Sequence, residues 1–261
     1  MHLSQCLLTN NDCYKAGQTI VPSGVMLHST GANNPWLRRY LAPDDGQLGT
    51  PSSRHWNQPG LSACVHAFIG KRADGTVAAY QALPWTTRGW HCGRGARGSA
   101  NDTHISIEIC EDDRTDPTYF QAAYQEACQL TAHLCRTYQL DPLAEGVVLC
   151  HAEGHQAGIA SNHGDVLHWF PLFGKTMDDM RTDVARMLKQ QEEDESLTQE
   201  QFNAMMDRWL ADRSTLPPAQ WAEPILKQAV ARGITDGSRP QALTTRQEVM
   251  AMVLAAAKQD G

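Results

Sequence analysis

The chain has 261 residues, of which 41% are hydrophobic and 20% are charged, and its formal net charge is −7. This length and composition predict one main globular domain with a small appendage. The negative charge gives no reason to expect nucleic acid as a partner, and it argues against binding to anionic surfaces through bulk charge.

The hydrophobic pattern before residue 189 predicts strands and helices in mixture. Short apolar or alternating runs predict strands in "SGVMLHST" (23–30), on both sides of a turn at Asp74–Gly75 in "VHAFIGKRADGTVAAYQAL" (65–83), in "HISIEIC" (104–110) and in "GVVLCH" (146–151). Helical spacing predicts helices over 117–140 and 176–190. The predicted fold class is therefore α/β, with a mixed central sheet flanked by helices.

The alternation in "HISIEIC" separates its side chains into two faces. It predicts Ile105, Ile107 and Ile109 on one face, and Glu108 with its polar neighbours on the other. A carboxylate that faces inward is costly unless it has a partner or a function. The alternation equally allows a solvated face, so the residues alone leave both interpretations of Glu108 open.

Two of the predicted strands finish on a histidine, His28 and His151. Strand ends in mixed folds open toward binding crevices, where two imidazoles could begin a zinc site. The alternative is that both histidines only form hydrogen bonds. The stretch that follows, "CHAEGHQAGIASNHGDVLHW" (150–169), is rich in further ligand-type side chains: Glu153, His155, His163, Asp165 and His168.

The eight cysteines are scattered and form no CxxC pair, which predicts mostly free, buried thiols. No segment approaches the ~20 apolar residues that a membrane helix needs, so membrane insertion is not expected. The first twenty residues lack the basic and apolar regions of a signal peptide. We therefore expect synthesis in the cytoplasm.

The residues 189–196, "KQQEEDES", are polar and acidic, and they predict a helix end that passes into a linker. The predicted domains are 1–190 and 197–261. The second domain is expected to be all-helical, with helices near 198–212, 218–232 and 245–258. The sequence "TRQE" predicts a capping box between Thr245 and Glu248.

In its first part the chain resembles zinc-dependent N-acetylmuramoyl-L-alanine amidases of type 2, a class related to phage lysozymes of the amidase kind and to peptidoglycan recognition proteins. The resemblance covers about residues 23–189. It rests on pieces that follow the family's order: "VMLHST", "VHAFIGKRADGTVAAYQALPWTTRGWHCG", "ISIEIC", "VVLCHAEG" and "SNHGD". The middle piece, a hairpin that leads to Trp-His-x-Gly, is the most specific.

This resemblance implies a surface cleft that holds Zn²⁺, with His28 and His151 as ligands and Glu108 as the acid–base carboxylate. The third ligand in the family is an Asp or Cys soon after the second histidine, often followed by Pro-Gly. Here no Pro-Gly occurs and the spacing is longer. We take Asp165 as the third ligand and His163, two positions earlier, as the oxyanion-stabilising residue. The alternative is that His163 is itself the ligand.

The remaining candidates are expected to support the cleft. Trp90 and His91 are predicted to bind substrate along its wall, although Trp90 could equally belong to the core. His155 and His168 are expected to shape the cleft or cap a helix. Glu153 is expected behind a ligand or at the surface. His66, in the hairpin, is expected to be structural.

The function implied by the resemblance is hydrolysis of the amide between N-acetylmuramic acid and L-alanine in peptidoglycan by a zinc-activated water. An endolysin or autolysin, made in the cytoplasm and acting on the wall after release, fits the missing signal peptide. Two alternatives are a non-catalytic peptidoglycan-binding protein of the same fold and an intracellular amidase that recycles muropeptides. The presence of the candidate ligands and of Glu108 favours the enzyme.

The C-terminal stretch 221–257 resembles one S-layer-homology-like repeat. Such repeats often bind cell-wall polymers, but usually several act together and this chain has one clear copy. Wall binding and homo-oligomerisation through the C-terminal helices therefore both remain expectations for this domain.

Overall fold

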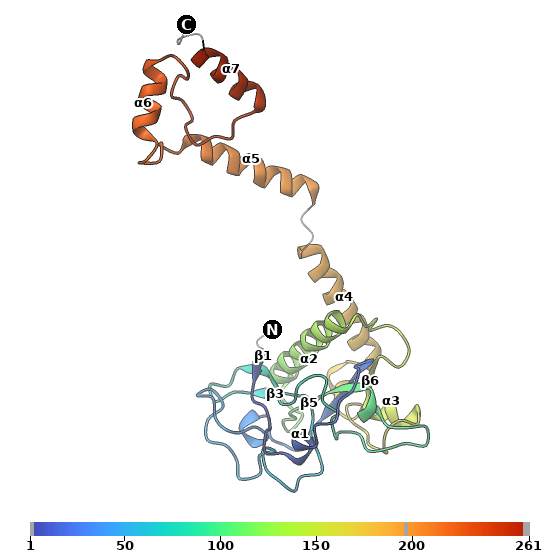
Figure 1. Ribbon diagram of the computed structural model, residues 1–261. Coiled ribbons are helices and arrows are strands. Elements are labelled where there is room, and N and C mark those ends of the chain that lie inside the picture. Colours follow the sequence, from blue (N-terminus) through green and yellow to red (C-terminus); the bar gives the residue numbers. More distant parts are fainter. Residues whose placement is uncertain (1–2, 196–197, 258–261) are drawn as a thin grey trace. The chain divides into compact units, whose positions relative to one another are not determined.

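The computed structural model describes residues 3–195 and 198–257. The chain divides into two compact units, Met1–Glu193 and Asp194–Gly261, and each is described by itself. The first unit contains a sheet with helices packed on it, and the second contains helices (Figure 1). Within the described residues, no helix is both long enough and apolar enough to cross a membrane.

The first unit is built on a six-stranded mixed sheet with the order β1-β4-β3-β5-β2-β6. The strands are β1 (Leu3–Gln5), β2 (Gly24–Ser29), β3 (Ala67–Lys71), β4 (Val77–Gln81), β5 (His104–Ile109) and β6 (Val148–Cys150). The hairpin β3–β4 is antiparallel, as its turn at Asp74–Gly75 predicts, and every other described pair is parallel. The predicted α/β class with a mixed central sheet is confirmed.

Four α-helices belong to this unit: α1 (Asp12–Ala16), α2 (Pro117–Tyr138), α3 (His151–Gln156) and α4 (Met177–Glu195). The start of α2 is set by Asp116, whose carboxylate accepts the N–H groups of Thr118 and Tyr119, and by Pro117 at the first turn. The helix ends where Gln139 adopts a left-handed conformation. Short 3₁₀ turns lie at Leu37–Arg39, Ala100–Asp102 and Phe170–Phe173.

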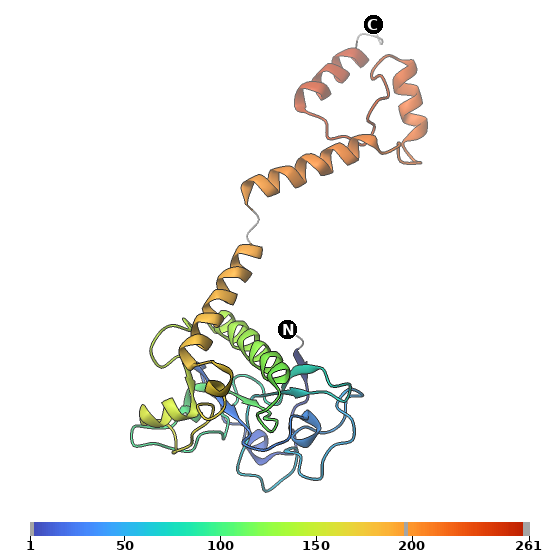
Figure 2. The same cartoon turned by 180° about the vertical axis from the view of Figure 1, so that it is seen from behind.

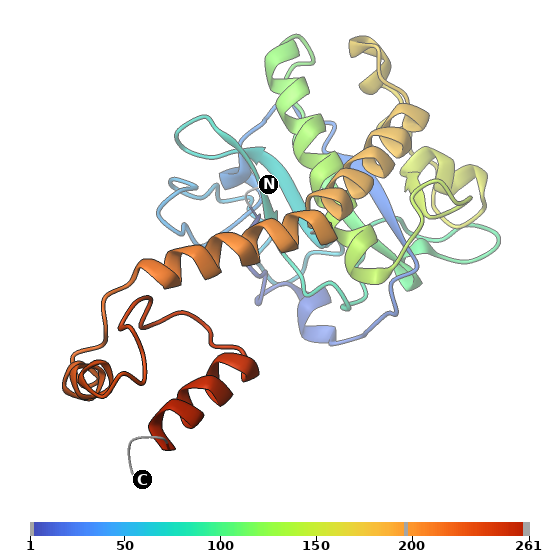
Figure 3. The ribbon, with the colours of Figure 1, turned by 90° about the horizontal axis from the view of Figure 1, so that it is seen from above.

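The core lies mainly between one face of the sheet and the helices α2 and α4, which pack against each other over the strands (Figures 2 and 3). Ile105, Ile107 and Ile109 of β5 all face this core, as their alternation predicts. Cys110, which alternation predicts on the face opposite the isoleucines, packs in a separate hydrophobic cluster on that opposite face of the sheet. That opposite face of the sheet is the one that carries Glu108.

Strand β6 forms one edge of the sheet and is only three residues long. Arg181 of α4 covers part of this edge, because its guanidinium donates a hydrogen bond of 2.9 Å to the carbonyl of Val148. The same guanidinium forms two further bonds to the carboxylate of Glu153 in α3, at 3.0 and 3.1 Å. Arg181 thus ties α4 to both the edge strand and the helix that follows it.

Three details differ from the sequence predictions. The prediction that "GVVLCH" ends as a strand on His151 is wrong, because β6 ends at Cys150 and His151 is the first residue of α3. Helix α4 is longer than the predicted helix 176–190, since it continues to Glu195, which still lies within the stretch 189–196 where the helix end is predicted. Strand β1 and helix α1 were not predicted. The eight cysteines are free and buried, as expected.

The second unit contains α5 (Gln199–Thr215), α6 (Glu223–Ala231) and α7 (Arg246–Ala257). These match the three predicted helices; the predicted end at Lys258 lies outside the described residues. The predicted capping box is present, since Glu248 accepts the Thr245 N–H at 2.7 Å and Thr245 Oγ1 accepts the Glu248 N–H at 3.3 Å. None of the three helices buries a residue in the structure.

Candidate metal centre

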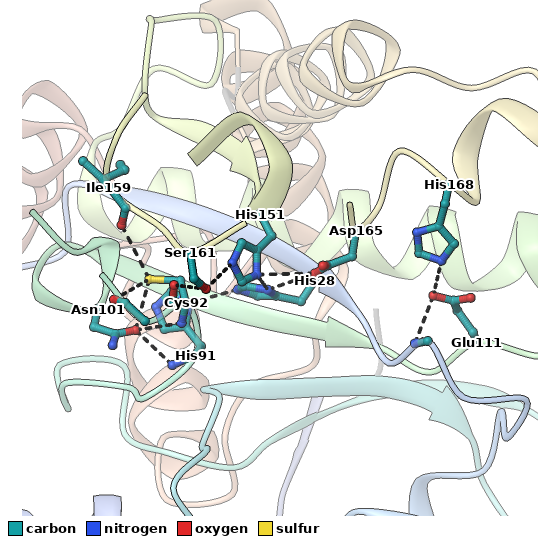
Figure 4. Close-up of polar contacts among 12 residues, drawn as sticks. His28, His91, Cys92, Asn101, Glu111, His151, Ile159, Ser161, Asp165 and His168 are labelled. Carbon is teal, nitrogen blue, oxygen red and sulfur yellow. Dashed lines mark hydrogen bonds and ion pairs between the residues drawn. The ribbon is translucent and has the colours of Figure 1, made fainter. Parts of the chain in front are cut away.

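Three side chains from three different segments converge in the first unit. His28 comes from β2, His151 from the first turn of α3, and Asp165 from the loop after α3 (Figure 4). His28 Nδ1 lies 3.1 Å from Asp165 Oδ2 and 3.1 Å from His151 Nδ1. His151 Nδ1 lies 3.7 Å from Asp165 Oδ2. The three predicted ligands are therefore neighbours, although they are far apart in sequence.

The triangle formed by these atoms fits zinc. Tetrahedral zinc holds nitrogen and oxygen ligands at about 2.0–2.1 Å, which places neighbouring ligand atoms about 3.3 Å apart. The observed separations of 3.1–3.7 Å bracket that value. Two imidazoles and one carboxylate also form a donor set that zinc prefers when one position stays open for water.

The protonation states of His151 and Asp165 also favour metal binding. Burial, strengthened by the neighbouring His28, lowers the pKa of His151 to about 4, so its ring is neutral at physiological pH and has a lone pair for a metal. Burial works to raise the pKa of Asp165, but its hydrogen bond with His28 and its electrostatic interactions with His28 and His151 outweigh that effect. The pKa of Asp165 therefore lies below its ordinary value, and the carboxylate is ionised.

Glu108 lies beside these residues. It occupies the position of β5 that is opposite His28 in the parallel β2–β5 pair. Burial raises the pKa of the Glu108 carboxyl well above its ordinary value, and the nearby carboxylates of Asp165 and Glu111 raise it further. The sequence left open whether Glu108 faces inward or lies on a solvated face. In the structure its side chain lines the same cavity as His28 and does not lie on a freely solvated face.

All of these residues line one open cavity of about 370 Å³. The cavity is also lined by the predicted residues His163, Trp90 and His91. His163 is exposed, and its ring centre lies 4.7 Å from that of His151. Asp165, rather than His163, lies within the group of three converging side chains. His163 is left with an exposed imidazole at the cavity rim.

Trp90 and His91 differ in their surroundings. Trp90 is half-buried and packs against the cluster that contains Phe68, so it belongs both to the core margin and to the cavity wall. His91 turns its Nδ1 toward His28 Nε2, at 2.9 Å. Its own Nε2 is buried and has no hydrogen-bond partner among the described residues.

The other candidates lie outside the group of three. His155 bonds to the carbonyl of Ala160, at 3.2 Å, within its own loop. His168 bonds to the buried carboxylate of Glu111, at 2.8 Å, and lines a separate cavity of about 340 Å³. Glu153 caps the N-terminus of α3, because its carboxylate accepts the Cys150 N–H at 3.1 Å. His66 is fully buried, as a structural histidine is expected to be.

Two polar residues near the centre were missed by sequence reasoning. Asn101 is buried and accepts hydrogen bonds from the backbone of residues 91 and 92. Ser161 lies 3.3 Å from His151 Nε2. Neither carries a sequence signal, because single Asn and Ser residues in loops are common and only their spatial neighbours distinguish them.

Comparison with known proteins gives a family. Residues 18–166 match the family described as N-acetylmuramoyl-L-alanine amidase, and this match spans more than half of the chain. It includes His28, Glu108, His151 and Asp165. No curated protein matches the chain.

Several solved structures are similar to part of the chain. The hydrolase AmiA of Staphylococcus aureus, in complex with its ligand, is 16% identical over 72% of this chain and 83% of that chain, with a TM-score of 0.49. A mutant endolysin from Bacillus subtilis is 20% identical over 70% of this chain and 99% of that chain, with a TM-score of 0.47. AmpDh3 of Pseudomonas aeruginosa, in complex with anhydromuramic pentapeptide, is 18% identical over 91% and 82%, with a TM-score of 0.32.

Proposed function

Because this chain belongs to the N-acetylmuramoyl-L-alanine amidase family, we propose that it is a zinc-dependent peptidoglycan hydrolase that cleaves the amide between N-acetylmuramic acid and L-alanine. The observation that carries the zinc dependence is the convergence of His28, His151 and Asp165 in a cavity that also holds Glu108. A binding protein without catalysis would need neither the complete donor set nor a carboxylate beside it.

The three converging side chains would hold the zinc ion through His28 Nδ1, His151 Nδ1 and Asp165 Oδ2. Zinc bound there would supply a water molecule with its pKa lowered to about 7 and a positive charge near the amide oxygen. The cavity of about 370 Å³ leaves room for the scissile amide beside these residues.

Glu108 is proposed as the acid–base residue. Its carboxylate accepts the proton of the attacking water and later delivers a proton to the nitrogen of the departing L-alanine. A general base works best when its pKa lies near the working pH. The raised pKa of Glu108 moves the carboxyl in that direction from its ordinary value.

His163 is proposed to stabilise the negative charge that develops on the amide oxygen. The imidazole stands at the rim of the cavity, next to His151, and is exposed. A single well-placed donor of this kind typically lowers the barrier by about 3 kcal/mol. Trp90, on the cavity wall, is proposed to contact the substrate through its apolar ring surface.

The assignment can be tested on purified sacculi. The full chain should release peptides that start with a free L-alanine amine, detected by labelling of new amino groups and mass spectrometry. Treatment with a strong chelator should abolish release, and added Zn²⁺ should restore it. Cleavage at a different bond, or full activity after complete removal of metal, would refute the proposal. Binding to sacculi with no released peptide would identify the non-catalytic alternative.

We also propose that the second unit brings the enzyme to its insoluble substrate or to another copy of itself. The unit exposes many large apolar side chains, of which Trp221 is 77% exposed. Exposed apolar side chains that form a contiguous patch mark interaction sites. Contact with the wall through this unit would raise the effective concentration of the enzyme at the polymer. An enzyme confined to soluble fragments, as in muropeptide recycling, would have no such need.

A further inference from the structure

The two histidine ligands are each held by their second ring nitrogen. His28 Nε2 lies 2.9 Å from His91 Nδ1, and His151 Nε2 lies 3.3 Å from Ser161 Oγ (Figure 4). Ser161 Oγ in turn donates to the carbonyl of Cys92, at 2.9 Å. These two series of contacts, called here the two chains of contacts, both end on the dipeptide His91–Cys92. His28 reaches it directly, and His151 reaches it through Ser161.

The dipeptide is itself fixed by Asn101. The side-chain oxygen of Asn101 accepts the backbone N–H of His91 at 2.9 Å and of Cys92 at 3.0 Å. Asn101 is 7% exposed and lies in the 3₁₀ turn Ala100–Asp102, where Ser99 caps its N–H. The loop that carries Ser161 is bound to the same dipeptide, since the Ser161 N–H also donates to the Cys92 carbonyl, at 2.8 Å.

These contacts allow one assignment of ring protons once Nδ1 of each ligand faces the metal. His28 must then carry its proton on Nε2 and donate it to His91 Nδ1. His151 must likewise donate from Nε2 to Ser161 Oγ, whose own proton goes to the Cys92 carbonyl. The Nε2 protons of both ligands and the hydroxyl proton of Ser161 each meet an acceptor, and the proton of His91 then lies on its own Nε2. A hydrogen bond at the second ring nitrogen is the usual way in which a protein sets the tautomer and ring orientation of a metal-bound histidine.

The surroundings of the two ring nitrogens of His91 fit this role better than a polar contact with substrate. Its Nδ1 is engaged by His28, and its Nε2 is sealed from solvent without a partner among the described residues. No ring nitrogen of His91 is thus available to a ligand in the cavity. His91 contributes to the cavity wall through the rest of its side chain or its backbone.

We propose that His91, Ser161 and Asn101 are positioning residues that hold both histidine ligands in the metal-binding tautomer and orientation. His91 and Ser161 do this by direct contact, and Asn101 does it by fixing the dipeptide on which both chains of contacts end. This inference rests on the proposed zinc site, and it gives His91 a role different from the substrate contact expected from the sequence.

The test is zinc affinity, measured on the metal-free full chain by competition with a chromophoric chelator. His91→Phe keeps a planar ring but removes the acceptor, and it should weaken zinc binding by about 10- to 100-fold, the usual cost of losing such a contact. His91→Asn keeps an acceptor near the position of Nδ1 and should restore most of the affinity. Ser161→Ala should weaken binding in the same way, and Ser161→Thr should restore it.

Asn101 and the control are tested in the same assay. Asn101→Asp keeps the accepting oxygen and should bind zinc more tightly than Asn101→Leu. His155→Phe, on α3 but outside the two chains of contacts, should leave the affinity unchanged. Circular dichroism and thermal unfolding of each metal-free variant establish that the fold is retained.

Three results would overturn the inference. One is a folded His91→Phe protein that binds zinc as tightly as the wild type. Another is a His91→Asn protein as weak as His91→Phe. The third is a variant of His91 with unchanged zinc affinity and a raised KM, which would make His91 a substrate contact. Wild-type protein that binds no zinc would instead refute the proposed metal site itself, so the two failures are distinguishable.

Discussion

His28 and Glu108 lie directly opposite each other in the parallel pair β2–β5. Side chains alternate along a strand, so opposite residues of a pair share one face of the sheet. The preceding residues, Leu27 and Ile107, are also opposite each other and face the helical core. The backbone ladder therefore places the proposed base beside the first proposed metal ligand and separates both from the apolar side of the sheet.

Glu108→Gln should abolish proton transfer and leave the metal in place. The amide has nearly the shape of the carboxylate but cannot accept the proton of the water. We expect wild-type zinc content and a loss of at least ~100-fold in kcat on soluble muropeptides. Atomic absorption and steady-state kinetics on the same preparation check this. Near-normal turnover by the zinc-loaded variant would contradict the role.

Asp165→Ala and His163→Ala should have opposite signatures. Asp165 completes the group of three converging atoms, so its removal should lower zinc affinity and activity together. His163 stands outside that group, so its removal should keep zinc and reduce kcat by roughly 100-fold, as loss of an oxyanion donor does. Metal content after dialysis separates the two. Loss of zinc from His163→Ala with retention in Asp165→Ala would reverse the assignment.

His66 should make the protein acid-sensitive. Burial lowers its pKa to about 4, and its Nδ1 and Nε2 are both engaged in the neutral form, with Ser106 and with the Thr87 carbonyl. In the unfolded chain its pKa is about 6.5. Above pH 6.5 both states are neutral and His66 adds no pH dependence. As pH falls from 6.5 toward 4, His66 becomes protonated in the unfolded state but stays neutral in the folded state. The free energy of unfolding therefore decreases.

The size of this effect is measurable by urea unfolding at pH 7.5 and pH 5 with zinc saturating. His66 should contribute about 2 kcal/mol to the stability lost between these two values. His66→Gln has no proton to gain, and its loss should be smaller by that amount, whereas His133→Gln on α2 should behave like the wild type. Equal acid sensitivity of His66→Gln and wild type would show that His66 is not the source.

Truncation after Glu195 should leave a working catalytic unit. The first compact unit ends at Glu193 and contains every proposed catalytic and metal-binding residue. The shortened chain should bind zinc and cleave soluble muropeptides at the wild-type rate, but clear intact cells poorly if the second unit contacts the wall. Sedimentation of residues 198–261 with purified walls tests that contact. Analytical ultracentrifugation of both chains tests the alternative, in which only the full chain self-associates.

The sequence predicts those parts of the site that lie on strands. The alternation in "HISIEIC" is strong enough to place Glu108 on a defined face, and the apolar run before His28 predicts its strand. The alternation of β5 is readable because successive side chains of a strand point to opposite faces, and the apolar run of β2 is readable because both of its faces are buried. The position of Asp165 was predicted by resemblance to a family, and no periodicity marks it, because it lies in a loop.

The parts that could not be predicted depend on contacts between distant segments. His151 looks like the end of a strand, but the apolar run gives no sign that Cys150 and Glu153 form a capping box which starts a helix there. Asn101 and Ser161 gain their importance only because the fold brings the dipeptide His91–Cys92 between them. Strand β1 has three residues, too few for a pattern to be recognised.

The guanidinium of Arg181 at the β6 edge has a consequence for the behaviour of the protein at high concentration. An uncovered edge strand presents free carbonyl and N–H groups on which a strand of another molecule can assemble, and this is a common start of aggregation. Arg181 occupies the Val148 carbonyl and puts a charged side chain, ion-paired with Glu153 and Asp178, on this edge. Natural sheets often protect their edges with charged side chains. Arg181 gives the same protection to the β6 edge, which lies next to β2, the strand that carries His28.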